Sequence, residues 1–186
     1  RRLGDLPVIT GINGAQKNEA EPQMLSQTDA QSWVDDLKNF PSILTYLTET
    51  RGLKPEILKK YCVGAKKHRF PGASMEEEWV DHDCMVFPWT TTRTINGSDV
   101  VYTRAKVRSL QDKSCMRLLP RGGEWGLFGW HTVPHDAEEV IITEGEFDAM
   151  AVHQATGLPA ISLPNGCRSL PPQLLPCLEK FKRIIL

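Results

Sequence analysis

Three carboxylates follow directly after an apolar run in the second half of the chain. Residues 140–143 read VIIT and residues 144–148 read EGEFD, so Glu144, Glu146 and Asp148 flank Gly145. The apolar run predicts a parallel strand, and open α/β sheets bind their ligands at the carboxyl ends of such strands. Mg²⁺ prefers oxygen ligands and often bridges to substrate phosphates. This acidic turn, residues 144–148, therefore predicts phosphoryl-transfer chemistry on nucleotides or nucleic acid.

The residues of the acidic turn differ in the structural roles that could explain them without a ligand. Gly145 permits a tight turn and a close approach of a ligand to the backbone. Glu146 and Asp148 could instead complement the positive end of the dipole of the helix that follows. Glu144 precedes that helix, which makes a capping role harder to assign to it. Asn165 and Gly166, after the next predicted strand, either line the same site or form an ordinary turn.

A basic stretch precedes the acidic turn. Residues 100–108 alternate, which predicts a strand with a polar face that carries cations. Arginine forks suit oxyanions and lysine acts as a point charge, so this face predicts contacts with phosphates. A solvated face with salt bridges remains the alternative. The predicted phosphate-binding residues are Arg104, Lys106, Arg108, Lys113 and Arg117.

The overall composition is that of a globular protein. The chain has 186 residues, 40% hydrophobic and 24% charged, with a formal net charge of −1. Its five cysteines form no CxxC pair, which argues against a zinc site or a disulfide framework. The sequence contains no run long enough to span a membrane and no GxxxxGK[ST] loop for ATP. Because it lacks an initial methionine and stops in an apolar run, we expect a fragment of a longer protein.

The order of elements predicts an α/β protein in two parts. Residues 1–28 predict a flexible linker, followed by three helices within 29–64, the last closed by Gly64, and a polar loop over 66–80. Strands are expected at 84–88, 90–95 and 100–108, with a hairpin turn at Asn96 and Gly97. In the 100–108 strand Tyr102 should share the face of the cations. Strands at 140–143, 160–163 and 183–186 then alternate with helices at 147–156, ended by Gly157, and at 171–181, which predicts parallel strands.

These residues resemble a known family. The acidic turn, together with the run SLPNG at 162–166, is similar to the Toprim domain shared by bacterial-type primases, topoisomerases and phage primase-helicases. Residues 154–159 (QATGLP), 170–176 (LPPQLLP) and 181–185 (FKRII) narrow the resemblance to Twinkle-type mitochondrial replicative helicases. Upstream, residues 51–53 (RGL), 87–89 (FPW), 106–108 (KVR) and 126–129 (GLFG) resemble the primase lobe of that family.

The resemblance implies a domain plan and a site. It implies a primase N-lobe of helices and antiparallel strands over 29–130, and a parallel-sheet Toprim domain, incomplete at its C-terminal end, over 131–186. Glu144 would be catalytic, and Glu144 and Asp148 would hold Mg²⁺ in a site that lacks an Asp-x-Asp motif expected after Leu186. ATP would bind only to a ring helicase domain absent here. The resemblance also implies oligomeric rings, single-stranded DNA and nucleotides as partners, and residence in the mitochondrial matrix.

Two roles stay open within this resemblance. The chain could be a binding module that holds single-stranded DNA for an attached 5′–3′ helicase. It could instead be an active RNA primase module that makes primers by metal-dependent nucleotidyl transfer.

Overall fold

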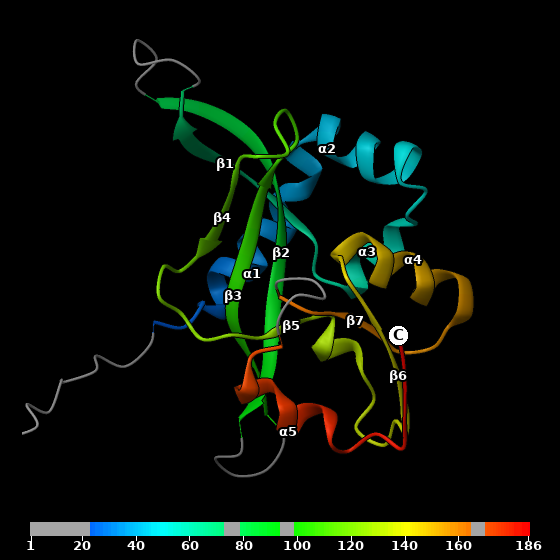
Figure 1. Cartoon of the computed structure of the whole chain (residues 1–186). Coiled ribbons are helices and arrows are strands. Elements are labelled where there is room, and N and C mark those ends of the chain that lie inside the picture. The colour runs from blue at the N-terminus through cyan, green and yellow to red at the C-terminus, as the bar shows by residue number, and fades with distance from the viewer. Residues whose placement is uncertain (1–22, 73–78, 94–98, 165–169) are drawn as a thin grey trace, which may run out of the picture.

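The computed structural model describes residues 23–72, 79–93, 99–164 and 170–186. These residues form an eight-stranded mixed sheet of order β4-β3-β2-β5-β7-β6-β8, with β1 paired to β2 (Figure 1). The strands are β1 (Gly64–Pro71), β2 (Trp79–Arg93), β3 (Asp99–Ser109), β4 (Met116–Leu119), β5 (Leu127–Phe128), β6 (Glu139–Thr143), β7 (Ala160–Ser162) and β8 (Arg183–Ile185). The pairing of Phe128 with Ser162 joins an antiparallel half to a parallel half. The sheet therefore runs across the boundary expected between residues 130 and 131.

Helices precede the antiparallel half. They are α1 (Gln27–Asp36), the short 3-10 helix η1 (Leu37–Asn39), α2 (Pro41–Thr45), the short π-helix η2 (Tyr46–Thr50) and α3 (Pro55–Lys60). The Ser26 hydroxyl caps α1 by accepting a hydrogen bond from the Asp29 amide at 3.1 Å. Leu25 is buried and its amide donates to the Thr103 carbonyl. The last residues of the expected 1–28 linker thus belong to the fold, and the first 22 lie outside the described residues.

Of the segment expected to be a polar loop, 66–80, the described residues 66–72 and 79–80 are mostly strand. β1 pairs with the first part of β2, and its buried Ala65 and Phe70 flank a run of polar residues. Charged side chains are common on edge strands, where they block pairing with other chains. The expectation that Gly64 ends a helix is also wrong, because Gly64 begins β1. A Cβ on Gly64 would lie 2.6 Å from the carbonyl carbon of Trp33, so only glycine allows α1 to pack this closely.

The strand expected at 84–88 and the described residues, 90–93, of the one expected at 90–95 belong to one long strand, β2. Pro88 lies inside it, opposite Ala105, and the register shifts between Trp89 and Thr90. This irregularity makes Thr103 an extra residue in β3. The β3 residues that precede Thr103 therefore point to the opposite face of the sheet from the one that simple alternation predicts. Tyr102 therefore packs with the cluster under α1, not on the face of the cations as expected. The hairpin turn expected at residues 96–97 lies outside the described residues.

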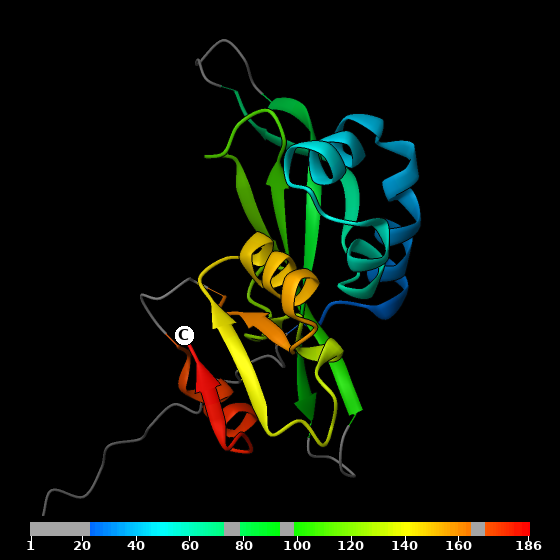
Figure 2. The ribbon, with the colours of Figure 1, turned by 90° about the vertical axis from the view of Figure 1, so that its right-hand side faces the viewer.

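The parallel half follows the predicted order. β6 pairs in parallel with both β7 and β8 (Figure 2). Helix α4 (Glu146–Thr156) connects β6 to β7 and ends at Gly157, whose φ of +72° is the left-handed conformation expected of a C-cap glycine. The helix expected at 171–181 is shorter, with the 3-10 turn η5 (Pro172–Leu174) followed by α5 (Leu175–Leu178). The short strands β4 and β5 were not predicted.

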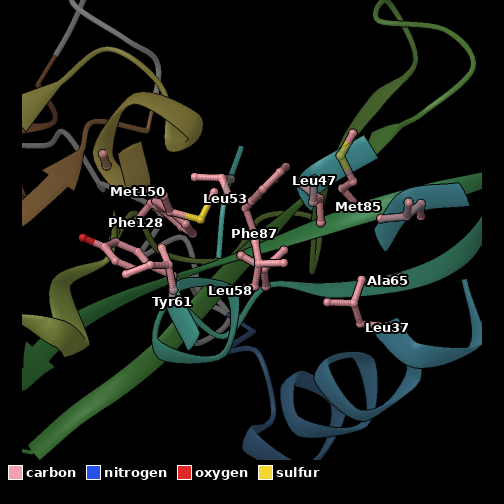
Figure 3. Packing of buried hydrophobic residues seen from close by; sticks show 14 of the residues in the cluster. Leu37, Leu47, Leu53, Leu58, Tyr61, Ala65, Met85, Phe87, Phe128 and Met150 are labelled. Atoms are coloured by element: carbon pink, nitrogen blue, oxygen red, sulfur yellow. The ribbon is translucent and has the colours of Figure 1, made fainter. Parts of the chain in front are cut away.

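The largest core cluster lies between the sheet and helices α2, α3 and α4 (Figure 3). Phe87 of β2 contributes a fully buried ring that meets Phe128 edge-on at 5.8 Å and Phe147 of α4 at 5.4 Å. The hydroxyl of Tyr61, the residue after α3, donates to the Ala160 carbonyl of β7 at 2.8 Å. These contacts fix α4 against the antiparallel half of the sheet and the end of α3 against the parallel half. Helix α1 covers the opposite face of β1–β3 through Cys84 and Val86.

Replacing Phe87 with alanine tests this packing. We expect Phe87→Ala to lower the free energy of unfolding by about 3–5 kcal/mol, because it leaves a cavity between β2 and α4. The matched control on the same strand is Trp79→Ala, which removes a ring that is 54% exposed. Urea unfolding should show a change of only about 0.5 kcal/mol for the control. Equal losses for the two variants would contradict the packing described here.

Candidate nucleic-acid interface

Three cations on β3 form a row on the face covered by α2–α4. Arg104, Lys106 and Arg108, here called the cation row, lie opposite Trp89, Phe87 and Met85 of β2 in the antiparallel register. Residues directly opposite in an antiparallel pair share a face, so the row borders the main core. The intervening Ala105 and Val107 are buried on the α1 face. For these three residues the faces are those that the alternation predicts.

Each cation of the row lies over an aromatic ring. The Arg104 Cζ is 4.9 Å from the Trp125 ring centre, the Lys106 Nζ is 5.6 Å from that of Trp89, and the Arg108 Cζ is 5.9 Å from that of Phe147. Cations within about 6 Å of a ring face are attracted by its quadrupole.

Arg104 is partly desolvated. Partial burial lowers the pKa of its guanidinium from the ordinary value, although arginine stays protonated in proteins. Its Nε atom is buried and has no hydrogen-bond partner among the residues that the structure describes. The Trp125 ring therefore holds the Arg104 guanidinium in place.

Lys106 forms an ion pair with Glu146, the first residue of α4. The two side chains are only 16% and 6% exposed, whereas those of the surface pair Lys182–Glu138 are 74% and 66% exposed. A carboxylate in the first turn of a helix also gains from the helix dipole. This buried pair brings the basic stretch and the acidic turn of the sequence together at one place.

The acidic turn presents its other two acids to solvent. Glu144 and Asp148 are exposed on either side of the buried Glu146. The Thr143 hydroxyl donates to the Gly145 carbonyl at 3.0 Å and steadies the turn. Gly145 has extended backbone, with φ of −132°, and a Cβ there would lie 3.1 Å from Asp148 Oδ2. Glycine thus allows Asp148 to approach closely, and no left-handed conformation is involved.

The predicted metal ligands form at most part of a site. Within the described ranges, no group of three or more His, Cys, Asp or Glu side chains is placed to hold a metal ion. Glu144 and Asp148 offer exposed carboxylates of the kind that Mg²⁺ prefers, so they fit as partial ligands. Asn165 and Gly166, predicted to line the site, lie outside the described residues.

Two of the predicted phosphate-binding residues lie apart from the cation row. Arg117 of β4 pairs with Val107, so it lies on the α1 face, and its Cζ is 5.6 Å from the Phe70 ring centre. Lys113 is exposed in the connection between β3 and β4. The structure therefore brings three of the five predicted cations together.

The structure adds Arg51, which the sequence did not identify. Its Cζ is 4.2 Å from the ring centre of Phe147, the ring that Arg108 also approaches, and its Nε donates to the Tyr46 hydroxyl at 2.8 Å. Gln154 of α4 fixes the following loop by donating to the Gly52 carbonyl at 2.9 Å and accepting from the Lys54 amide at 2.8 Å. No local pattern marks the contact of Arg51 with Phe147, because the two residues are far apart in sequence.

Solved primase structures share this architecture. The Escherichia coli primase catalytic core superposes with a TM-score of 0.60 at 15% identity, over 84% of this chain and 58% of that one. The RNA polymerase domain of Mycobacterium tuberculosis primase, in complex with double-stranded DNA, gives 0.55 at 18% identity, over 83% and 58%. A DnaG primase catalytic domain bound to single-stranded DNA gives 0.51 at 16% identity, over 84% and 62%.

The fold is that of part of a primase catalytic core. The chain spans about three fifths of the length of these primase structures. No protein-family model matches the sequence. Among the described residues, no helix combines the length and apolarity needed to cross a bilayer.

Proposed function

We propose that this chain is the primase-like region of a Twinkle-type replicative helicase and that it holds single-stranded DNA along the cation row. The observation that carries the proposal is the placement of Arg104 and Arg108 over aromatic rings, beside an acidic turn, in a primase-core fold. The likeness to primase domains bound to DNA supports it. Mitochondrial residence and an attached ring helicase belong to the same proposal and rest on the sequence resemblance.

The physical basis is the attraction of phosphates to oriented guanidinium groups. Arg104 and Arg108 lie over different rings, and extended backbone separates their Cα atoms by about 14 Å. They would therefore contact separate phosphates of one strand. Contacts with phosphates do not distinguish one base from another, so the binding would depend weakly on sequence and strongly on salt concentration.

Alanine substitutions in the row test the binding proposal. We expect Arg104→Ala and Arg108→Ala each to weaken binding of a labelled single-stranded oligonucleotide and to reduce the slope of log Kd against log salt by about 0.7. Fluorescence anisotropy between 50 and 200 mM salt, about the range over which such contacts weaken strongly, measures both quantities. Lys182→Ala is the control, because Lys182 is exposed at the amino ends of the parallel strands. Unchanged slopes for both arginine variants would reject the proposal.

The exposure of Glu144 favours a second candidate function, template-dependent primer synthesis. Glu144 follows the carboxyl end of β6, in the same turn as the Glu146 that reaches the cation row. There its carboxylate could accept a proton from an attacking hydroxyl while the arginines hold nucleotide phosphates. Glu144 and Asp148 would hold part of a Mg²⁺ site, and the bound ion would stabilise charge on the transferring phosphoryl group.

Primer synthesis by the intact protein on a single-stranded template separates the two candidates. If the domain primes, Glu144→Gln should lower the rate by about 10²-fold or more, because a positioned general base contributes at least that much. Glu138→Gln, at the opposite ends of the strands, should leave the rate unchanged. Priming of equal rate in the wild type and Glu144→Gln would exclude this role for Glu144, and an absence of priming in both would favour the DNA-holding role.

A further inference from the structure

We infer that Glu146 acts as an internal counter-ion that withholds Lys106 from nucleic acid, so that the cation row contacts phosphates through its two arginines alone. The inference rests on the proposed DNA-binding function and specifies it further. The observation behind it is the central position of Lys106 in the row, combined with its buried ion pair to α4.

Burial makes this pair costly to exchange for a pair with phosphate. A phosphate that took Lys106 would leave a carboxylate only 6% exposed without its cation and close to the incoming negative charge. Desolvation and like-charge repulsion both oppose that state. Within the described part of the chain, the two arginines form no buried ion pair of this kind, and their guanidinium groups lie over neutral rings.

The three carboxylates of the acidic turn differ in exposure, and the buried one belongs to the ion pair. Glu146 points inward to Lys106, whereas the flanking Glu144 and Asp148 are exposed. Glu146 lies in the first turn of α4, where the helix dipole favours a charged carboxylate. The site therefore presents two arginines and two outward acids, while a third cation and a third acid cancel each other inside.

The salt dependence of DNA binding distinguishes a withheld lysine from a lysine that contacts phosphate. A lysine that is already paired with Glu146 does not neutralise a phosphate. It therefore releases none of the counterions that are condensed on the DNA. Two variants use this difference. Glu146→Gln frees Lys106 at nearly constant shape, and the double variant Lys106→Met/Glu146→Gln removes both charges together, so that no unpaired charge is buried.

Anisotropy titrations with a labelled single-stranded oligonucleotide, at several salt concentrations, provide the test. We expect the slope of log Kd against log salt to steepen by about 0.7 in Glu146→Gln, since one more cation reaches the strand. The double variant should keep the wild-type slope. Thermal unfolding of each variant checks that it is folded, and the double variant decides the question alone if Glu146→Gln is unfolded.

The inference is overturned if the double variant loses about 0.7 of the slope, as expected for Arg108→Ala, because Lys106 would then contact phosphate in the wild type. An unchanged slope in folded Glu146→Gln would overturn it as well. These results leave the proposed DNA-binding function standing, provided that Arg104→Ala and Arg108→Ala weaken binding. If the arginine variants also bind normally, the proposed function fails together with the inference.

Discussion

The ion pair between Lys106 and Glu146 joins the two halves of the sheet at the site. Lys106 belongs to β3 in the antiparallel half, and Glu146 begins α4, which connects the parallel strands β6 and β7. Burying two charges is costly unless the geometry holds them together. The core supplies that geometry, because Phe87 lies opposite Lys106 in the sheet and its ring packs against Phe147, next to Glu146. Packing and electrostatics therefore fix the same contact.

Aromatic rings give the cation row its form. Long basic side chains on a strand are normally mobile, and ordering them costs conformational entropy. Here Trp125 and Phe147 lie under Arg104 and Arg108, and Phe147 also contacts Arg51 from the loop after η2. Much of that cost is thus met during folding, before any ligand binds. A preorganised row of this kind suits a ligand with regularly repeated charges, such as a nucleic-acid backbone.

Much of the parallel half could be predicted from the sequence. Its strands are apolar runs and its helix α4 ends at a glycine, so local signals and the right-handed crossover rule suffice. The face of the cation row was also predictable, because strand alternation is local. Arg117 was grouped with the row because sequence distance does not reveal that β4 turns it to the other face.

The remaining errors arose where long-range pairing overrides local pattern. β1 carries charges that predict a loop, yet it forms an edge strand because β2 is long enough to pair with it. Tyr102 changed face because the irregularity at Trp89 and Thr90 depends on the partner strand. The contact of Arg51 with Phe147 and the Lys106–Glu146 pair join residues far apart in sequence, so no periodicity could have indicated them.

A double-mutant cycle on the free energy of unfolding tests most directly whether Lys106 and Glu146 are coupled. Urea unfolding of Lys106→Met, Glu146→Gln and the double variant should give a coupling energy of about 1–3 kcal/mol. The same cycle on the exposed pair Lys182–Glu138 serves as the control and should give no more than about 0.5 kcal/mol. A coupling of Lys106 and Glu146 no larger than that of the surface pair would contradict the account, because the acidic turn and the cation row would then be independent.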